Sequence, residues 1–143
     1  MQDSQNLHLS SEKAYHAILH ASLLSAGFHV ISEASGGEGR SDITLFLNDG
    51  VCIVIELKYV PSTRTPNIAL KKNDGKDRAE KKRSEKAKEK RRVKELSAAL
   101  DSAEKQVRDK DYAGPYRATQ HKVICMAMAI RHRTEVAVRF FDC

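Results

Sequence analysis

Residues 39–60 read GRSDITLFLNDGVCIVIELKYV, and this stretch decides the fold. Two runs rich in β-branched and other apolar residues, 40–47 and 51–60, flank the triplet Asn-Asp-Gly at 48–50. Apolar runs of this length on either side of such a triplet are a strong signal for a β-hairpin. The sequence therefore predicts two antiparallel strands joined by a tight loop.

The length of the loop sets the register of the hairpin. If 48–50 form a three-residue loop, Leu47 faces Val51 and the numbers of paired residues sum to 98. Asp42 then lies opposite Glu56 with Cβ atoms about 5 Å apart, and Lys58 follows on the same face. The other face is entirely apolar: Ile43, Leu45, Leu47, Val51, Ile53, Ile55 and Leu57. A slip of one residue would spoil both faces, so the pattern favours this register.

Two carboxylates and a lysine at the end of a half-buried hairpin are costly unless they are compensated. A divalent cation would relieve the repulsion between Asp42 and Glu56, and hard oxygen ligands suit Mg²⁺ or Mn²⁺. Such a cation polarises a phosphate oxygen and lowers the pKa of bound water. Lys58 would hold the attacking water or offset charge developing on the phosphate. Alternatively, Asp42, Glu56 and Lys58 form a salt-bridge cluster that only stabilises the fold and binds no metal.

The rest of the chain predicts helices and strands around this hairpin. Ser10 or Ser11 can cap a helix that ends before Gly27, and residues 1–9 form a polar, flexible N-terminus. Apolar patterning then predicts a strand at 28–34, a glycine-rich turn at 36–39, a helix from about 75 to 110, and strands at 121–130 and 134–141. The order α-β-β-β-α-β-β suits a single α/β domain with a central mixed sheet flanked by helices.

The positive charge of the chain belongs to one segment. The net charge is +6, and residues 71–95 alone hold thirteen Lys or Arg against six Asp or Glu. Residues 62–92 thus form a basic, charged insertion, and the first half of the long helix lacks an apolar stripe and is expected to be exposed. Such a segment attracts phosphate, or it is simply a solvated helix face. Its candidate nucleic-acid contacts are Lys81, Lys82, Arg83, Arg91 and Arg92.

Composition excludes several protein classes. The 143 residues are 41% hydrophobic and 31% charged, which disfavours disorder. No apolar run is long enough to cross a membrane, and no signal peptide is apparent. Three cysteines at wide spacing form no zinc pattern and predict no disulfide framework. Cys52 and Cys125 are expected to be buried thiols, and a cytoplasmic location follows.

Four motifs in order resemble a known family. Gly39-Arg40-Ser41-Asp42 followed by Glu56-Leu57-Lys58 is similar to the signature of the PD-(D/E)XK nuclease superfamily, with the proline position replaced. The stretches SEKAYH at 11–16 and AEKQV at 103–107 extend the resemblance over about residues 10–130. The branch they resemble is often found C-terminal to an AAA-ATPase-like domain in bacterial proteins. The layout is also similar to archaeal Holliday-junction resolvases.

This resemblance implies a restriction-endonuclease-like αβββαβ core with a long charged helical insertion. It implies a nuclease that hydrolyses DNA phosphodiester bonds with Mg²⁺ or Mn²⁺, with Asp42 and Glu56 as metal ligands and Lys58 as the catalytic lysine. Glu12 would complete the acidic site, while Gln106 and Tyr112 would orient the lysine, the metal water or DNA. The chain departs from the branch in its longer, more basic insertion. It also has no Walker A loop, so an AAA-ATPase-like partner would be a separate domain or protein.

Several of these residues have a second interpretation. Glu12 also suits the first turn of a helix, where the helix dipole favours an acid. Arg40 either contacts a phosphate or pairs with a neighbouring carboxylate. Gln106 on a charged helix would ordinarily face solvent, and Tyr112 either stacks on bases or covers a core edge. His16 lies one turn beyond Glu12 and is expected to pack the helix or to line the site.

Other functions also remain open at this stage. The chain is alternatively a non-cleaving nucleic-acid-binding or assembly module that keeps the nuclease fold. A third alternative is a nuclease fragment of a toxin or mobile element that needs an ATPase to act. The chain is either a stand-alone protein or a domain of a longer one. Homodimer formation is open as well, because one site cuts one strand.

Overall fold

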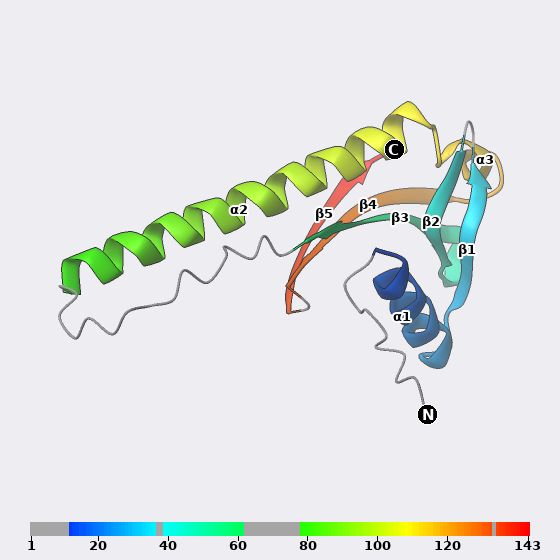
Figure 1. Ribbon diagram of the computed structural model, residues 1–143. Helices are drawn as coiled ribbons and strands as arrows, with labels where there is room; N and C mark the ends of the chain where they lie inside the picture. Colours follow the sequence, from blue (N-terminus) through cyan, green and yellow to red (C-terminus); the bar gives the residue numbers. More distant parts are fainter. Residues whose placement is uncertain (1–11, 37–38, 62–77, 133) are drawn as a thin grey trace, which may run out of the picture.

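The computed structural model describes residues 12–36, 39–61, 78–132 and 134–143. Five strands form one sheet in the order β1-β2-β3-β4-β5, with β3 and β4 parallel and the other neighbours antiparallel. The predicted mixed sheet with flanking helices is therefore confirmed (Figure 1). The elements are α1 (Glu12–Ser25), β1 (His29–Gly36), β2 (Gly39–Phe46), the 3-10 turn η1 (Asn48–Gly50), β3 (Val51–Val60), α2 (Arg78–Asp109), α3 (Gly114–Arg117), β4 (Lys122–Arg131) and β5 (Glu135–Asp142).

The β2–β3 hairpin has the predicted register. Ile43 pairs with Ile55 and Leu45 with Ile53, so paired numbers sum to 98. The Leu47 N–H donates to the Val51 carbonyl at 2.8 Å and closes the three-residue loop. Asp49 within that loop has φ of +71°, the left-handed region that Asp and Asn tolerate better than most residues. Loop chemistry and strand patterning thus agree on one register.

Helices α1 and α2 cover opposite faces of the sheet. On one face, Leu19 and Leu23 of α1 pack on a cluster formed by Val30, Ile43, Leu45, Ile55 and Met126. On the other face, α2 and the turn after it pack on Val54, Cys125, Ala127 and Ala129. The central strand β3 is consequently buried on both sides, as strands of a parallel pair usually are.

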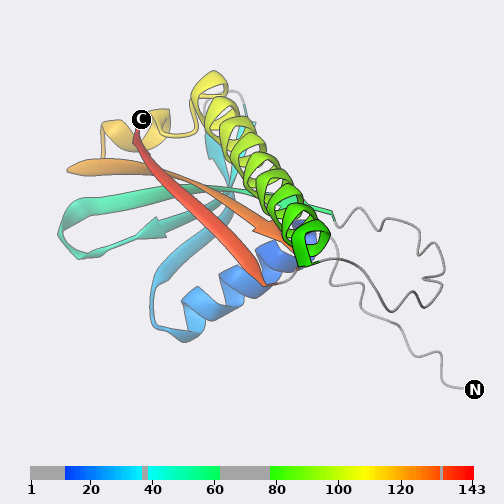
Figure 2. The same ribbon diagram turned by 90° about the vertical axis from the view of Figure 1, so that its left-hand side faces the viewer.

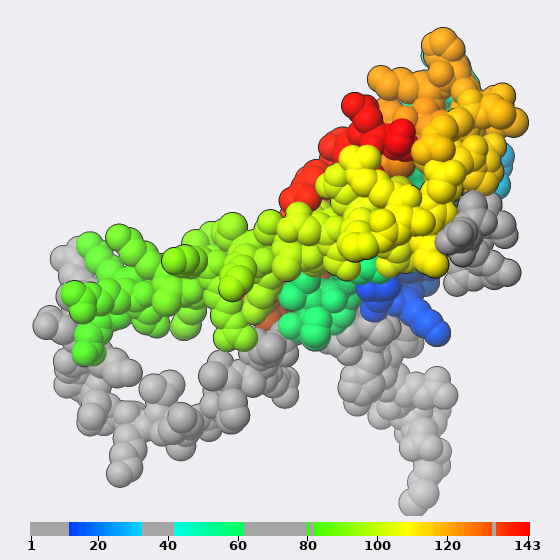
Figure 3. All heavy atoms as spheres, turned by 90° about the horizontal axis from the view of Figure 1, so that it is seen from above, coloured from blue at the N-terminus to red at the C-terminus, as the bar shows by residue number. Residues whose placement is uncertain are grey.

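Helix α2 has two unlike halves, as predicted. Its second half packs on the sheet through Leu100, Ala103 and Val107. Its first half projects beyond the sheet (Figures 1 and 3) and is mostly exposed. Val93 is 55% exposed, because it precedes the turns of the helix that reach the sheet. The predictions for residues 1–9, 62–77 and the centre of the glycine turn lie outside the described residues.

The prediction of a free thiol at Cys125 is wrong. Cys125 forms a disulfide with Cys143, with Cα atoms 5.6 Å apart, whereas Cys52 is free and buried as expected. The cause is the antiparallel pairing of β4 and β5, which places Cys125 opposite Phe141. Cys143 follows two residues later and reaches back. Spacing along the chain does not reveal such a pair.

A membrane-crossing helix, long and apolar over its whole length, does not occur in the described parts of the chain.

Candidate active site

The site lies where β2 separates from β3. The pairing of these strands ends at Ile43 and Ile55, while β2 continues to pair with β1 as far as Gly39. Beyond this point, side-chain carboxylates accept hydrogen bonds from the backbone N–H groups of β3. The Leu57 N–H donates to Asp42 Oδ2 at 2.8 Å, and the Tyr59 N–H donates to Glu12 Oε2 at 3.2 Å. Two acids from different elements therefore converge on one edge of β3.

Lys58 lies between two carboxylates. Its Nζ is 3.0 Å from Glu56 Oε1 and 3.9 Å from Glu12 Oε1. Burial by itself would lower the pKa of Lys58, but the hydrogen bond to Glu56 and the nearby negative charges together raise it. The lysine therefore stays protonated at neutral pH.

Glu56 is the most constrained group of the site. The residue is 1% exposed, and its second oxygen, Oε2, is buried without a hydrogen-bond partner among the described residues. Burial first, and then repulsion by Asp42, raise the pKa of Glu56 to about 7, although Lys58 opposes the shift. Burial also raises the pKa of Asp42, against the Leu57 N–H bond and the Lys58 charge. The two carboxyls resist being ionised together.

A divalent cation fits this pair of acids. The unsatisfied Glu56 Oε2 is a buried acceptor that a cation would satisfy, and positive charge would offset the repulsion between Glu56 and Asp42. Mg²⁺ commonly uses one or two carboxylates and completes its shell with water and substrate phosphates. Within the described ranges, no group of three or more His, Cys, Asp or Glu side chains is arranged to hold a metal. The protein would thus supply two ligands, Asp42 and Glu56.

Helix α1 is anchored to the site by two side chains. Glu12 bonds the β3 edge and contacts Lys58, so its predicted role as a third metal ligand stays a prediction. His16 Nε2 lies 2.7 Å from the Asp42 carbonyl oxygen, one helical turn after Glu12. His20, by contrast, hydrogen bonds with Ser32 and packs the helix on β1. The i, i+3/i+4 spacing of Glu12 and His16 was the sequence signal for this anchor.

Gln106 and Tyr112 lie on the opposite side of the sheet from α1. Gln106 Nε2 donates to Tyr112 Oη at 3.0 Å, and Tyr112 is 4% exposed in the core cluster beside Val54. A ring this deeply buried offers no free face for stacking on a base. The pair fixes the end of α2 over β3, the strand that carries Glu56 and Lys58, and the predicted catalytic role of Gln106 stays a prediction.

The basic candidates fall into two groups. Lys82 and Arg83 are exposed on the projecting half of α2. Arg91 pairs with Glu95 at 2.8 Å, while Arg92 pairs with Glu89 at 2.7 Å and with Glu135 of β5. The positions of the Arg40 and Lys81 side chains lie outside the described residues. Arg92 therefore helps to hold α2 on the sheet. The exposed cations Lys82 and Arg83 lie further out on the helix.

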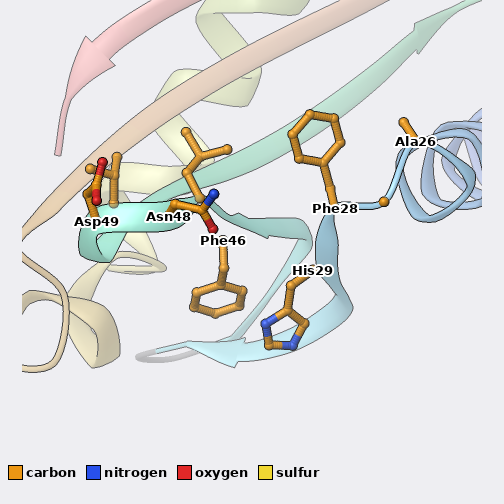
Figure 4. Close-up of a pocket in the computed structure, with 9 residues that line it drawn as sticks. Ala26, Phe28, His29, Phe46, Asn48 and Asp49 are labelled. Carbon is orange, nitrogen blue, oxygen red and sulfur yellow. The ribbon is translucent and has the colours of Figure 1, made fainter.

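Sequence reasoning did not find a cavity of about 700 Å³ at the loop end of the hairpin (Figure 4). Its lining includes Phe28, Phe46 and His29, whose ring stacks on that of Phe46 with centroids 5.0 Å apart. Asn48 and Asp49 border it, but Asp42 and Glu56 do not. The cavity is thus separate from the acidic site, and the scattered aromatic residues give no periodic signal from which to predict it.

Comparison with known proteins gives one match. A family model described as the PD-(D/E)XK nuclease superfamily matches residues 10–140. No curated protein and no solved structure matches the chain. The matched range includes all the described elements from α1 to β4 and most of β5, and both carboxylates that meet at the β3 edge.

Proposed function

Because the chain belongs to the PD-(D/E)XK nuclease superfamily, we propose that it is a Mg²⁺-dependent nuclease that hydrolyses phosphodiester bonds in DNA. The observation that carries the proposal is the buried Asp42–Glu56 pair beside a protonated Lys58. One oxygen of Glu56 lacks a partner within the described residues, and its neighbour Asp42 repels it. A cation that binds a phosphate would satisfy that oxygen and offset the repulsion.

Each residue has a distinct task in this reaction. Asp42 and Glu56 would hold the cation, which when bound polarises a phosphate oxygen and lowers the pKa of water. The Lys58 ammonium orients the attacking water or offsets charge that develops on the phosphate. Glu12 and Glu56 keep that ammonium in place. The water oxygen bonds to phosphorus, the bond from phosphorus to one nucleoside oxygen breaks, and that oxygen takes up a proton.

The first test removes one charge at the site. We expect Glu56→Gln to abolish Mn²⁺ binding measured by calorimetry, and to slow Mg²⁺-dependent cleavage of nicked, branched or single-stranded DNA. The loss should reach about 100-fold or more, since a bound cation stabilises the transition state by several kcal/mol. Asp109→Asn is the matched control, because Asp109 is exposed at the end of α2 opposite the projecting half.

Asp42→Ala separates cleavage from binding. A nuclease with this variant loses cleavage but still binds DNA in a gel-shift assay, whereas a non-cleaving module has no activity to lose. Wild-type protein that binds no Mn²⁺, with or without DNA, would contradict the proposal. The acids would then be a structural cluster, and the binding-module alternative would be preferred.

We also propose that the projecting half of α2 contacts the DNA backbone. Lys82 and Arg83 are exposed there, and no aromatic side chain accompanies them, so the contact would be made to phosphates and not to bases. Removing both cations should reduce the salt dependence of binding, d log K/d log[salt], by up to about 1.8 in magnitude. Lys110→Ala, which removes an exposed cation just beyond the other end of the helix, is the control. Equal slopes for the double variant and wild type would exclude this contact.

Two further proposals concern the setting of the protein. An AAA-ATPase-like partner is proposed from the resemblance alone, and its addition to a cleavage assay should raise turnover. A cytoplasmic location is proposed from the nuclease superfamily and not from cysteine usage, because the Cys125–Cys143 disulfide removes the argument from free thiols. Since disulfides persist mainly in oxidising compartments, Cys125 and Cys143 would be reduced there for part of the time. Alkylation of cell extracts, followed by mass spectrometry of the two thiols, tests that location.

A further inference from the structure

The outer strand β5 has an apolar face that no helix covers in the described structure. Val136, Val138 and Phe140 are 58%, 43% and 62% exposed. The opposite face of β5 packs on α2 through Ala137 and Phe141 (Figure 2). Helix α1 lies on the uncovered side, but it packs on β1, β2 and β3. Three large side chains at alternate positions of one strand therefore meet solvent.

This strand also lacks most of the features that protect a sheet edge. Native edge strands carry lysine, proline or a bulge, because their unpaired N–H and C=O groups attract other strands. β5 reads EVAVRFFD and contains none of these, and its eight residues pair with β4 without interruption. Two of its three charges are held on the α2 side: Glu135 pairs with Arg131 at 3.0 Å and Arg139 with Asp101 at 2.6 Å. A free, regular edge beside an apolar row favours a strand as its partner.

We propose that β5 pairs antiparallel with β5 of a second copy of this chain, with Ala137 on the two-fold axis. The two sheets then join into one of ten strands. In this register Val136 faces Val138 of the second copy, and the pair occurs twice, so the two valines of the exposed row cover each other, while Phe140 lies opposite Thr134 of the second copy. On the other face Glu135 lies opposite Arg139 of the second copy, again twice. Opposite charges and apolar pairs at facing positions stabilise antiparallel strands.

The charges select this register over its neighbour. The apolar rows of the two copies stay on the same face only if a residue lies on the two-fold axis. The register of the two β5 strands can therefore shift only by moving the axis from one residue to the next, and a neighbouring register places Val138 on the axis. Placing Val138 on the axis sets Val136 against Phe140 of the second copy, but it sets Glu135 against Phe141 and Arg139 against Ala137. Arg139 bonds Asp101 and Glu104 through Nη1, so its other N–H groups can reach a carboxylate across the axis. The edge is thus complementary to a copy of itself.

The proposed dimer leaves the acidic site open. Strand β4 separates β5 from β3, which carries Glu56 and Lys58, so the interface does not cover either residue. A dimer would present two such sites, one for each strand of a duplex. Dimer formation is measured without nucleic acid or metal, so its failure and the failure of the proposed nuclease activity are distinguishable.

Sedimentation velocity of the full chain tests the interface. We expect wild type to pass from monomer to dimer between roughly 1 and 200 µM, since a small interface binds in the micromolar range. Val138→Lys places a charge in the apolar row at an exposed position and should remain monomeric throughout. Val93→Lys is the matched control, because Val93 is also an exposed valine, at 55% against 43% for Val138, and it lies on α2 away from β5's outer face. Circular dichroism establishes that both variants fold. A monomeric wild type, or a Val138→Lys variant that dimerises normally, would overturn the proposal.

Cross-linking tests the register independently of affinity. Under mild oxidation, Val136→Cys mixed with Val138→Cys should give a covalent dimer, because these positions face each other. Val138→Cys alone should cross-link weakly. A strong cross-link with Val138→Cys alone and none in the mixture would place Val138 on the axis and overturn the proposed register.

Discussion

At the scale of single residues, the opposing influences on Glu56 govern the chemistry. Burial disfavours its charge, Asp42 repels it, and Lys58 attracts it from 3.0 Å. The first two prevail and raise the pKa of Glu56 to about 7. A carboxyl poised near neutral pH is ionised by a modest gain in positive potential, which is what an arriving cation provides.

The raised pKa predicts how stability depends on pH. A carboxyl whose pKa is 4.5 unfolded and about 7 folded keeps its proton longer in the folded state, so stability falls as pH rises through that window. Below pH 4.5 the ionisation of Glu56 does not change the free energy of unfolding, and above about pH 7 the destabilisation that it causes no longer grows with pH. We expect the free energy of unfolding to drop by a few kcal/mol between about pH 5 and pH 8, at about 1.4 kcal/mol per unit of pKa shift.

Urea denaturation of wild type and Glu56→Gln across this range measures the effect. The Gln variant should show a flatter profile, because it has no proton to lose. Added Mg²⁺ should stabilise wild type more at the upper end of the range than at the lower end, and should not stabilise the variant. Parallel profiles for the two proteins would contradict the assignment.

At the scale of elements, α2 shows how one helix serves two purposes. Its second half is held by apolar packing on β3 and β4, with Ala103 and Val107 almost fully buried. Its first half is held by charge pairs on its own surface and by Arg92, which reaches Glu135. Exposed ion pairs contribute little stability, so the projecting half is available for binding.

Truncation of one side chain in each half tests this division. Leu100→Ala removes a side chain that is 8% exposed and packs on Ala127 and Ala129, so we expect a loss of about 2–4 kcal/mol. Val93→Ala removes one that is 55% exposed, and the expected change is within about 0.5 kcal/mol. Thermal and urea unfolding report both values. Similar losses at the two positions would mean that the whole helix packs on the domain.

At the scale of the whole molecule, the sheet order determines what is accessible. The acids lie at an edge of β3 that opens because β2 leaves to follow β1. The helices lie on opposite faces, and neither covers the outer apolar face of β5. The C-terminus returns to β4 through the Cys125–Cys143 disulfide, which closes a loop containing the whole of β5.

That loop predicts a redox-dependent stability. A disulfide that closes a loop of this length contributes roughly 3 kcal/mol, chiefly by restricting the unfolded chain. Cys143→Ser should therefore lower the free energy of unfolding by about 2–4 kcal/mol under oxidising conditions. In dithiothreitol, wild type and variant should unfold alike. A difference that persists in reductant would show that Cys143 stabilises the fold by packing.

The predictable part of this protein is local. The hairpin register follows from a three-residue loop and an alternating pattern, and both belong to one continuous stretch. Because register places side chains, it also predicted that Asp42, Glu56 and Lys58 gather on one face. Contacts between distant segments were less predictable: the His16 bond to the Asp42 carbonyl and the burial of Tyr112 depend on how helices settle on the finished sheet.

The sequence by itself determined the order of the elements, the register of the hairpin and the grouping of its charged side chains, because these depend on periodicity and turn chemistry. Only the tertiary structure decided the protonation of Glu56, the partner of Cys125 and the exposure of β5. Each of these depends on which element covers which face. Burial and desolvation are properties of the assembled layers, and no local pattern along the chain contains them.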